Sequence, residues 1–95
     1  MSLLKFMNRD AVLFHLKEAK EELDRTINQI ASDSAYDFPE LQVAMSHLYS
    51  HLNTAWNGKD ASAERYGECS PNDFDTWRKF PSAADLLLDT DDAVT

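Results

Sequence analysis

The fold is decided by residues 9–32, RDAVLFHLKEAKEELDRTINQIAS, and residues 39–57, PELQVAMSHLYSHLNTAWN. Neither stretch contains glycine, and the one proline stands at the start of the second, where the first turn of a helix accepts it. Apolar residues recur every three or four positions, which is the period of a helix with one apolar stripe. The stripes are Val12, Leu16, Ala19, Leu23, Ile27 and Ile30, then Leu41, Met45, Leu48, Leu52 and Ala55/Trp56.

Residues that favour helix termini mark the ends of both stretches. Asn8 is a good N-cap for the first helix, and we expect Gly58 to end the second in a left-handed conformation. The connector between them is short and contains two turn-favouring aspartates. Helices joined in this way are typically antiparallel neighbours, and the matched spacing predicts that the two stripes pack against each other in a coiled-coil-like seam. The sequence therefore predicts an all-α fold built on an antiparallel two-helix hairpin.

A short aromatic helix is predicted over about residues 71–80. Ser70 is a suitable N-cap, Pro71 suits the first helical position, and Pro81 ends the pattern. Three aromatic residues follow one side of this helix and are expected to cover the hairpin: Phe74, Trp77 and Phe80. Residues 59–68 between Gly58 and this helix are interpreted as a loop or one irregular turn.

One domain is expected, because 95 residues support a single hydrophobic core. We place this domain at residues 1–88, where the leucine triplet 86–88 is its last apolar group. Residues 89–95 contain three aspartates and no large side chain except Val94, so we expect an acidic, disordered tail.

The charge distribution argues against nucleic acid and membrane as partners. The net charge is −8, and residues 1–32 are neutral, with five basic and five acidic side chains. Residues 33–95 therefore carry the whole charge, with four basic and twelve acidic side chains. Such a surface repels phosphate backbones and anionic lipid headgroups. No apolar run approaches a membrane span, and the single cysteine, Cys69, forms no internal disulfide, so we expect a cytoplasmic protein.

The three histidines form the candidate metal site. His47 and His51 are four residues apart and lie on one side of the second helix, while His15 lies on the first. A divalent metal held by His15, His47 and His51 between the helices is geometrically possible, so the alternative function is a metal-dependent helical-bundle enzyme or a metal-binding protein. The alternative is that all three are half-exposed residues at the edges of the apolar stripes, and H-x-x-x-H without a flanking acid is a weak pattern.

Other chemical signatures are missing, so we expect no cofactor and favour a protein without catalytic activity. There is no phosphate-binding glycine loop and no nucleophile elbow. Cys69 precedes the predicted third helix, whose dipole favours a thiolate, but no histidine is near in sequence. A lone cysteine in such a place is more often inert than catalytic.

An excess of apolar surface indicates a protein partner. Phe14 and Val43 lie almost opposite the stripes, while Tyr49 and Trp56 widen the second stripe. Two hairpins paired into a four-helix homodimer would bury this surface, although Phe14 can instead pack on the N-terminal segment or under the aromatic helix. We therefore predict a small interaction or assembly module, with a surface formed by Phe14, Val43, Tyr49, Trp56, Phe74, Trp77 and Phe80. A third hypothesis is a ligand pocket lined by Trp56, Phe74 and Trp77.

Overall fold

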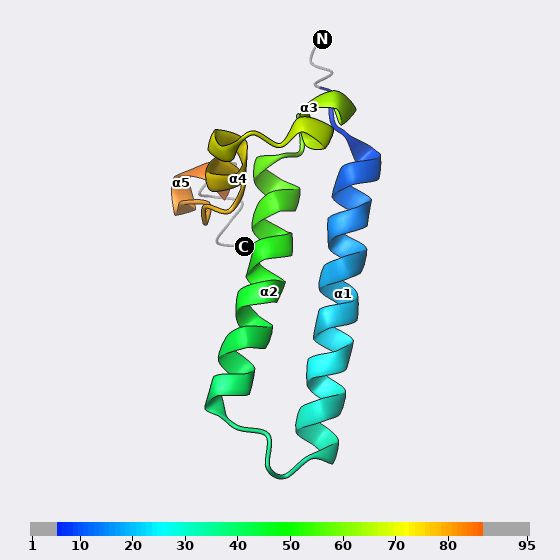
Figure 1. Cartoon of the computed structure of the whole chain (residues 1–95), viewed down its shortest axis with the longest axis vertical. Coiled ribbons are helices and arrows are strands. Elements are labelled where there is room, and N and C mark those ends of the chain that lie inside the picture. The colour runs from blue at the N-terminus through cyan, green and yellow to red at the C-terminus, as the bar shows by residue number, and fades with distance from the viewer. Residues whose placement is uncertain (1–5, 87–95) are drawn as a thin grey trace, which may run out of the picture.

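The computed structural model describes residues 6–86, which form five helices and no strand. The helices are α1 (Arg9–Ser32), α2 (Phe38–Asn57), α3 (Ala63–Glu68), α4 (Pro71–Trp77) and α5 (Ala83–Leu86). Figure 1 shows α1 and α2 side by side and antiparallel, with the three short helices gathered near the end of α2. The predicted all-α hairpin is confirmed. The predicted tail at residues 89–95 lies outside the described residues.

Side-chain caps explain where the two long helices begin. The Asn8 carboxamide oxygen accepts a hydrogen bond from the Ala11 amide at 3.1 Å, and its nitrogen donates to the Ala61 carbonyl at 3.0 Å. At the start of α2, the Asp37 carboxylate accepts from the Glu40 amide, and the Glu40 carboxylate accepts from the Asp37 amide. This reciprocal arrangement satisfies donors that the first turn of a helix cannot pair internally.

The prediction for Gly58 is wrong in its conformation, although α2 does end there. Gly58 has a φ of −100°, so it is not left-handed. A β-carbon at this position would collide with the Tyr66 hydroxyl, which donates a hydrogen bond to the Gly58 carbonyl at 2.8 Å. Glycine is needed because the α3 side chain approaches the backbone closely, not because of a positive φ.

The segment after α2 differs from prediction in two ways. Residues 63–68 form a helix, α3, where a loop or irregular turn was expected. The aromatic helix α4 ends at Trp77, three residues earlier than the predicted 71–80. Its start is as expected, because the Ser70 hydroxyl accepts a hydrogen bond from the Asp73 amide at 3.1 Å. Side chains of α2 bind the carbonyls of Trp77 and of the two residues that follow it.

Two asparagines of α2 hold the end of α4. The Asn53 carboxamide donates to the Arg78 carbonyl at 3.0 Å, and the Asn57 carboxamide donates to the Trp77 and Lys79 carbonyls at 3.1 and 2.6 Å. Carbonyls at a helix end need such donors, because they have no partner within the helix. These bonds seat α4 against α2.

The predicted seam between the two apolar stripes is not what the structure shows. The buried residues of α1 are Ala19 and Thr26, and the two buried alanines of α2 are Ala44 and Ala55. Small side chains let the helix axes approach closely, so the larger stripe residues lie beside the contact and not in it. Among the described residues no large side chain is fully buried, and the buried hydrophobic residues are four alanines and Trp77.

We expect Asn57→Ala to lower the free energy of unfolding by about 1–3 kcal/mol, because it leaves two carbonyls near the end of α4 without their donor. Chemical denaturation followed by circular dichroism measures this change. Asn28→Ala, at an exposed asparagine of α1, should change the same quantity by less than about 0.5 kcal/mol. Equal effects of the two substitutions would contradict this account of how α4 is held.

Candidate functional site

The two long helices present their large apolar side chains on one common face of the hairpin. A hollow of about 380 Å³ on this face is lined by Val12 and Leu16 from α1 and by Leu52 and Trp56 from α2. At about 100° of rotation per residue, the other large stripe residues lie within about 40° of Leu16 on α1 or of Leu52 on α2. We call this the apolar face; it comprises Val12, Leu16, Leu23, Ile27 and Ile30 of α1 and Leu41, Met45, Leu48, Leu52 and Trp56 of α2.

The apolar face is open in the single chain. The side chains of Leu16, Leu23, Ile27, Ile30 and Leu52 are between 40% and 55% exposed. No acidic residue of α1 or α2 lies within about 40° of Leu16 or Leu52 on its own helix, and the basic residues there are Arg9 and Lys20. A large exposed apolar patch with few charges is typical of a surface that binds another protein.

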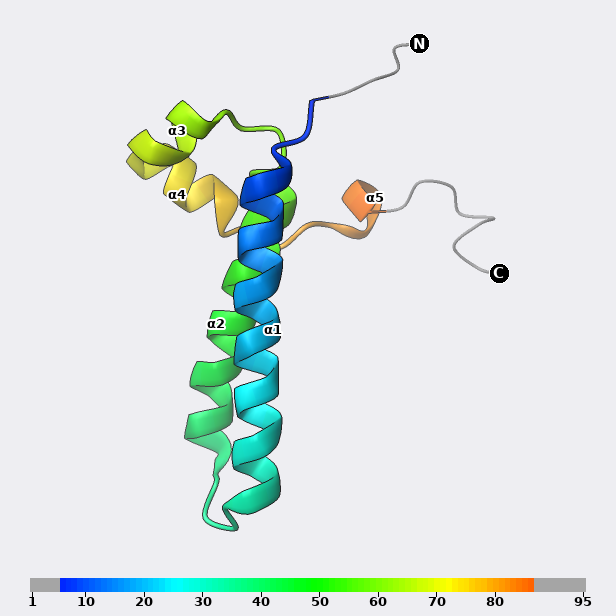
Figure 2. The same cartoon turned by 90° about the vertical axis from the view of Figure 1, so that its right-hand side faces the viewer.

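The opposite face of the hairpin is polar. A hollow on this side is lined by Glu22 and Gln29 of α1 and by Glu40, Val43 and His47 of α2. Figure 2 shows α3 and α4 on one side of the plane of the hairpin and α5 on the other. Because Tyr66 of α3 and Trp77 of α4 line a hollow together with His15 and His51, α3 and α4 lie on the polar side.

The structure brings two of the three predicted metal ligands together. The Nδ1 atoms of His15 and His51 are 3.3 Å apart, and both residues are half-buried. Their ring centroids are 5.5 Å apart, and the Tyr66 ring lies 6.2 Å from that of His15. This pair links α1 to α2 on the polar face.

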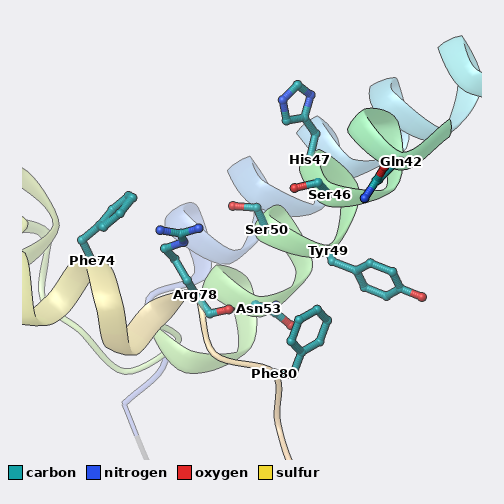
Figure 3. A pocket seen from close by; sticks show the side chains of 9 residues that line it. All are labelled: Gln42, Ser46, His47, Tyr49, Ser50, Asn53, Phe74, Arg78 and Phe80. Atoms are coloured by element: carbon teal, nitrogen blue, oxygen red, sulfur yellow. Dashed lines mark hydrogen bonds between the residues drawn. The ribbon is translucent and has the colours of Figure 1, made fainter. Parts of the chain in front are cut away.

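His47 lies outside this pair. Its side chain is 62% exposed, and its Nδ1 lies 3.5 Å from a Glu22 carboxylate oxygen that also accepts from Arg25. Together with Phe74 and Arg78 it borders a hollow of about 480 Å³ between α2 and α4 (Figure 3). No group of three or more His, Cys, Asp or Glu side chains within residues 6–86 is placed to hold a metal ion.

Burial controls the charge state of His15. It lowers the pKa of His15 below its ordinary value of 6.5, and repulsion from His51 lowers it further, while Glu18 acts in the opposite direction. The neutral form of His15 is therefore favoured in the folded chain, with one ring nitrogen available as an acceptor or a metal ligand.

The predicted interaction surface is scattered in the structure. Phe14 and Val43 are exposed but lie on the polar side, about 160° around their helices from Leu16 and Met45. Tyr49 contacts Phe80 edge to face, with centroids 5.3 Å apart, on the outer side of α2. Trp77 is buried, stacked on Tyr66 at 4.8 Å, so it does not contribute to an open surface.

The residues of the third hypothesis, a pocket shared by Trp56, Phe74 and Trp77, line different hollows in the structure. Phe74 and Trp77 line the hollow of the histidine pair, whereas Trp56 lies on the apolar face with the Lys59 ammonium 3.9 Å from its ring centroid. Cys69 is exposed and borders the hollow of the histidine pair.

The prediction that the stripe residues are buried between the two helices is wrong for most of the large ones. Leu16, Leu23, Ile27 and Ile30 were expected inside the hairpin, yet they form its exposed face. One signal was present for part of the contact: Ala19 and Ala55 are the members of the stripes small enough for close helix contact, whereas Ala44 lies next to the second stripe and was not part of it.

Comparisons with known protein families, with curated proteins and with solved structures find no match to this chain. Within residues 6–86 no helix combines the length and apolar character needed to cross a membrane.

We expect the stability of the chain to fall as the pH decreases below about 6.5, because the unfolded chain then protonates His15 more readily than the folded chain does. The contribution of His15 is complete above that pH and is lost as the pH falls through the lowered pKa of the folded state. His15→Gln should therefore reduce the change in Tm between pH 7.5 and pH 5.5, measured by circular dichroism at one protein concentration. An unchanged difference in Tm would contradict this assignment.

Proposed function

We propose that this chain is a small assembly module that pairs with a second copy of itself through the apolar face and forms a four-helix bundle. One observation supports this proposal above the others: the large apolar side chains of both long helices share one open face. Within the described residues, the buried hydrophobic core consists of four alanines and one tryptophan, and only three of the alanines belong to the two long helices. A core that small contributes little to the stability of a single chain.

The dimensions of the apolar face suit a stable dimer. A helix of 24 residues is about 36 Å long, and two packed helices are roughly 18 Å wide, so the face projects about 600 Å². Its accessible area is larger than this projection because side chains protrude from it. Each partner contributes roughly 800 Å² to an interface of standard size, so the apolar face is of the required order.

The spacing of the apolar side chains supports a second copy over an unrelated partner. On α1, Leu16, Leu23 and Ile30 of the apolar face are separated by seven positions each, which is symmetrical about Leu23. On α2 the residues 41, 45, 48 and 52 are separated by 4, 3 and 4. A two-fold axis that lies in the plane of the interface and runs perpendicular to the helices places each helix against the same helix of the partner, running in the opposite direction. Spacing that is identical in both directions then brings apolar residues opposite apolar residues.

The test compares two matched substitutions. Ile27 is 55% exposed on the apolar face and Val43 is 57% exposed on the polar face, and each follows an acidic residue three positions earlier. We expect Ile27→Glu to raise the dimer dissociation constant by about a hundredfold, because each copy then buries a carboxylate without a partner. Val43→Glu should leave the dissociation constant within about threefold of the wild-type value. Sedimentation equilibrium from 1 to 100 μM measures all three proteins, and circular dichroism checks that they are equally helical.

A wild-type chain that remains monomeric at 100 μM would overturn the proposal. An equal loss of dimer in both variants would also contradict it, because the apolar face would then have no special role. Another occupant, such as the leucines at the C-terminal end of the same chain, would give a monomer whose stability falls in Ile27→Glu alone.

A further inference from the structure

The contact between His15 and His51 has a geometry that a hydrogen bond alone does not require. Both rings present the same atom, Nδ1, to each other at 3.3 Å, and the ring planes are inclined by 38°. The two residues come from different helices and are 36 positions apart in sequence. A hydrogen bond between them requires that the Nδ1 atom of one ring carries a proton and donates it. The Nδ1 atom of the other ring must then be unprotonated and accept it.

The same separation matches two ligands of one metal ion. Transition-metal ions such as Zn²⁺ bind histidine nitrogens at about 2.0–2.1 Å, and the angle between ligands at a tetrahedral ion is about 109°. Two nitrogens on one such ion are therefore roughly 3.3–3.4 Å apart. The Nδ1 atoms of His15 and His51 already have this separation, so binding requires little movement of α1 relative to α2.

The surroundings leave room for the remaining ligands. The pair borders a hollow of about 290 Å³ that is also lined by Tyr66, Cys69 and Trp77. This volume accommodates several water molecules as exchangeable ligands. Burial favours the neutral form of His15, which is the form that binds a metal. Glu18 is the acidic group whose charge acts on His15.

We propose that His15 and His51 form a two-histidine binding site for a divalent transition-metal ion of the Zn²⁺, Ni²⁺ and Cu²⁺ class, with water at the other positions. Imidazole nitrogen suits these ions, whereas Mg²⁺ and Ca²⁺ prefer oxygen ligands. The bound ion links α1 to α2 and adds a constraint to a hairpin whose core is small. This site lies on the polar face, so it goes beyond the proposed assembly function and does not depend on it.

Zn²⁺ titration by isothermal calorimetry tests this proposal with a matched histidine as the control. We expect one Zn²⁺ per wild-type chain and a rise in Tm of about 5–10 °C at a Zn²⁺ concentration about ten times the dissociation constant. His51→Gln should weaken Zn²⁺ binding at least tenfold. His47→Gln removes a histidine one turn away on the same helix and should bind Zn²⁺ as the wild type does. Mg²⁺ should produce no effect.

A spectroscopic measurement on the wild-type chain avoids reliance on variants that fold poorly. In ¹⁵N NMR spectra, Zn²⁺ should shift the Nδ1 signals of His15 and His51 and leave those of His47 unchanged. The absence of Zn²⁺ binding would overturn the proposal, and so would equal weakening in His51→Gln and His47→Gln. Ile27→Glu should still bind one Zn²⁺ per chain, so failure of the metal site and failure of the dimer are separate results.

Discussion

The close contact between α1 and α2 through small side chains is the constraint on which the rest of the structure depends. Ala19 of α1 and Ala44 and Ala55 of α2 are buried there, and alanine brings helix axes near to each other without filling a core. The leucines and isoleucines consequently lie on one open face, and the polar residues lie on the other. The same close approach brings His15 within 3.3 Å of His51. The open apolar face and the contact between His15 and His51 are thus both consequences of the alanine contact between α1 and α2.

Polar bonds hold the short helices where the hairpin has little apolar surface to offer them. Side-chain amides of α2 bind the carbonyls at the end of α4, and the Arg65 guanidinium binds the buried Asp73 carboxylate at 2.7 Å. Hydrogen bonding by Arg65 is the main reason why the pKa of Asp73 is lowered. Trp77 is the one large apolar residue buried in this region, stacked on Tyr66. These contacts position Tyr66 beside the histidine pair, so the short helices form one wall of that hollow.

The sequence predicted the helices well and their relative rotation poorly. The caps at Asn8 and Asp37 and the stop at Gly58 define helix ends by local chemistry, so both long helices were predicted nearly residue for residue. Periodicity gives the direction of a stripe on its own helix, but it does not say which direction faces the neighbour. The pairing of His15 with His51 and not His47 depends on the register of the hairpin, which the connector length alone does not determine. α3 was missed because six residues show no apolar period, although Ser62 is a good N-cap.

Contacts between methyl groups of different chains test the central claim, that a second copy covers the apolar face. Mixing equal amounts of ¹³C-labelled and unlabelled chains allows isotope-filtered NMR to detect only contacts between copies. The account predicts intermolecular contacts from the methyl groups of Leu16, Leu23 and Ile27, and none from Val43 on the polar face. Intermolecular contacts confined to Val43, or their absence from every methyl group at millimolar concentration, would contradict it.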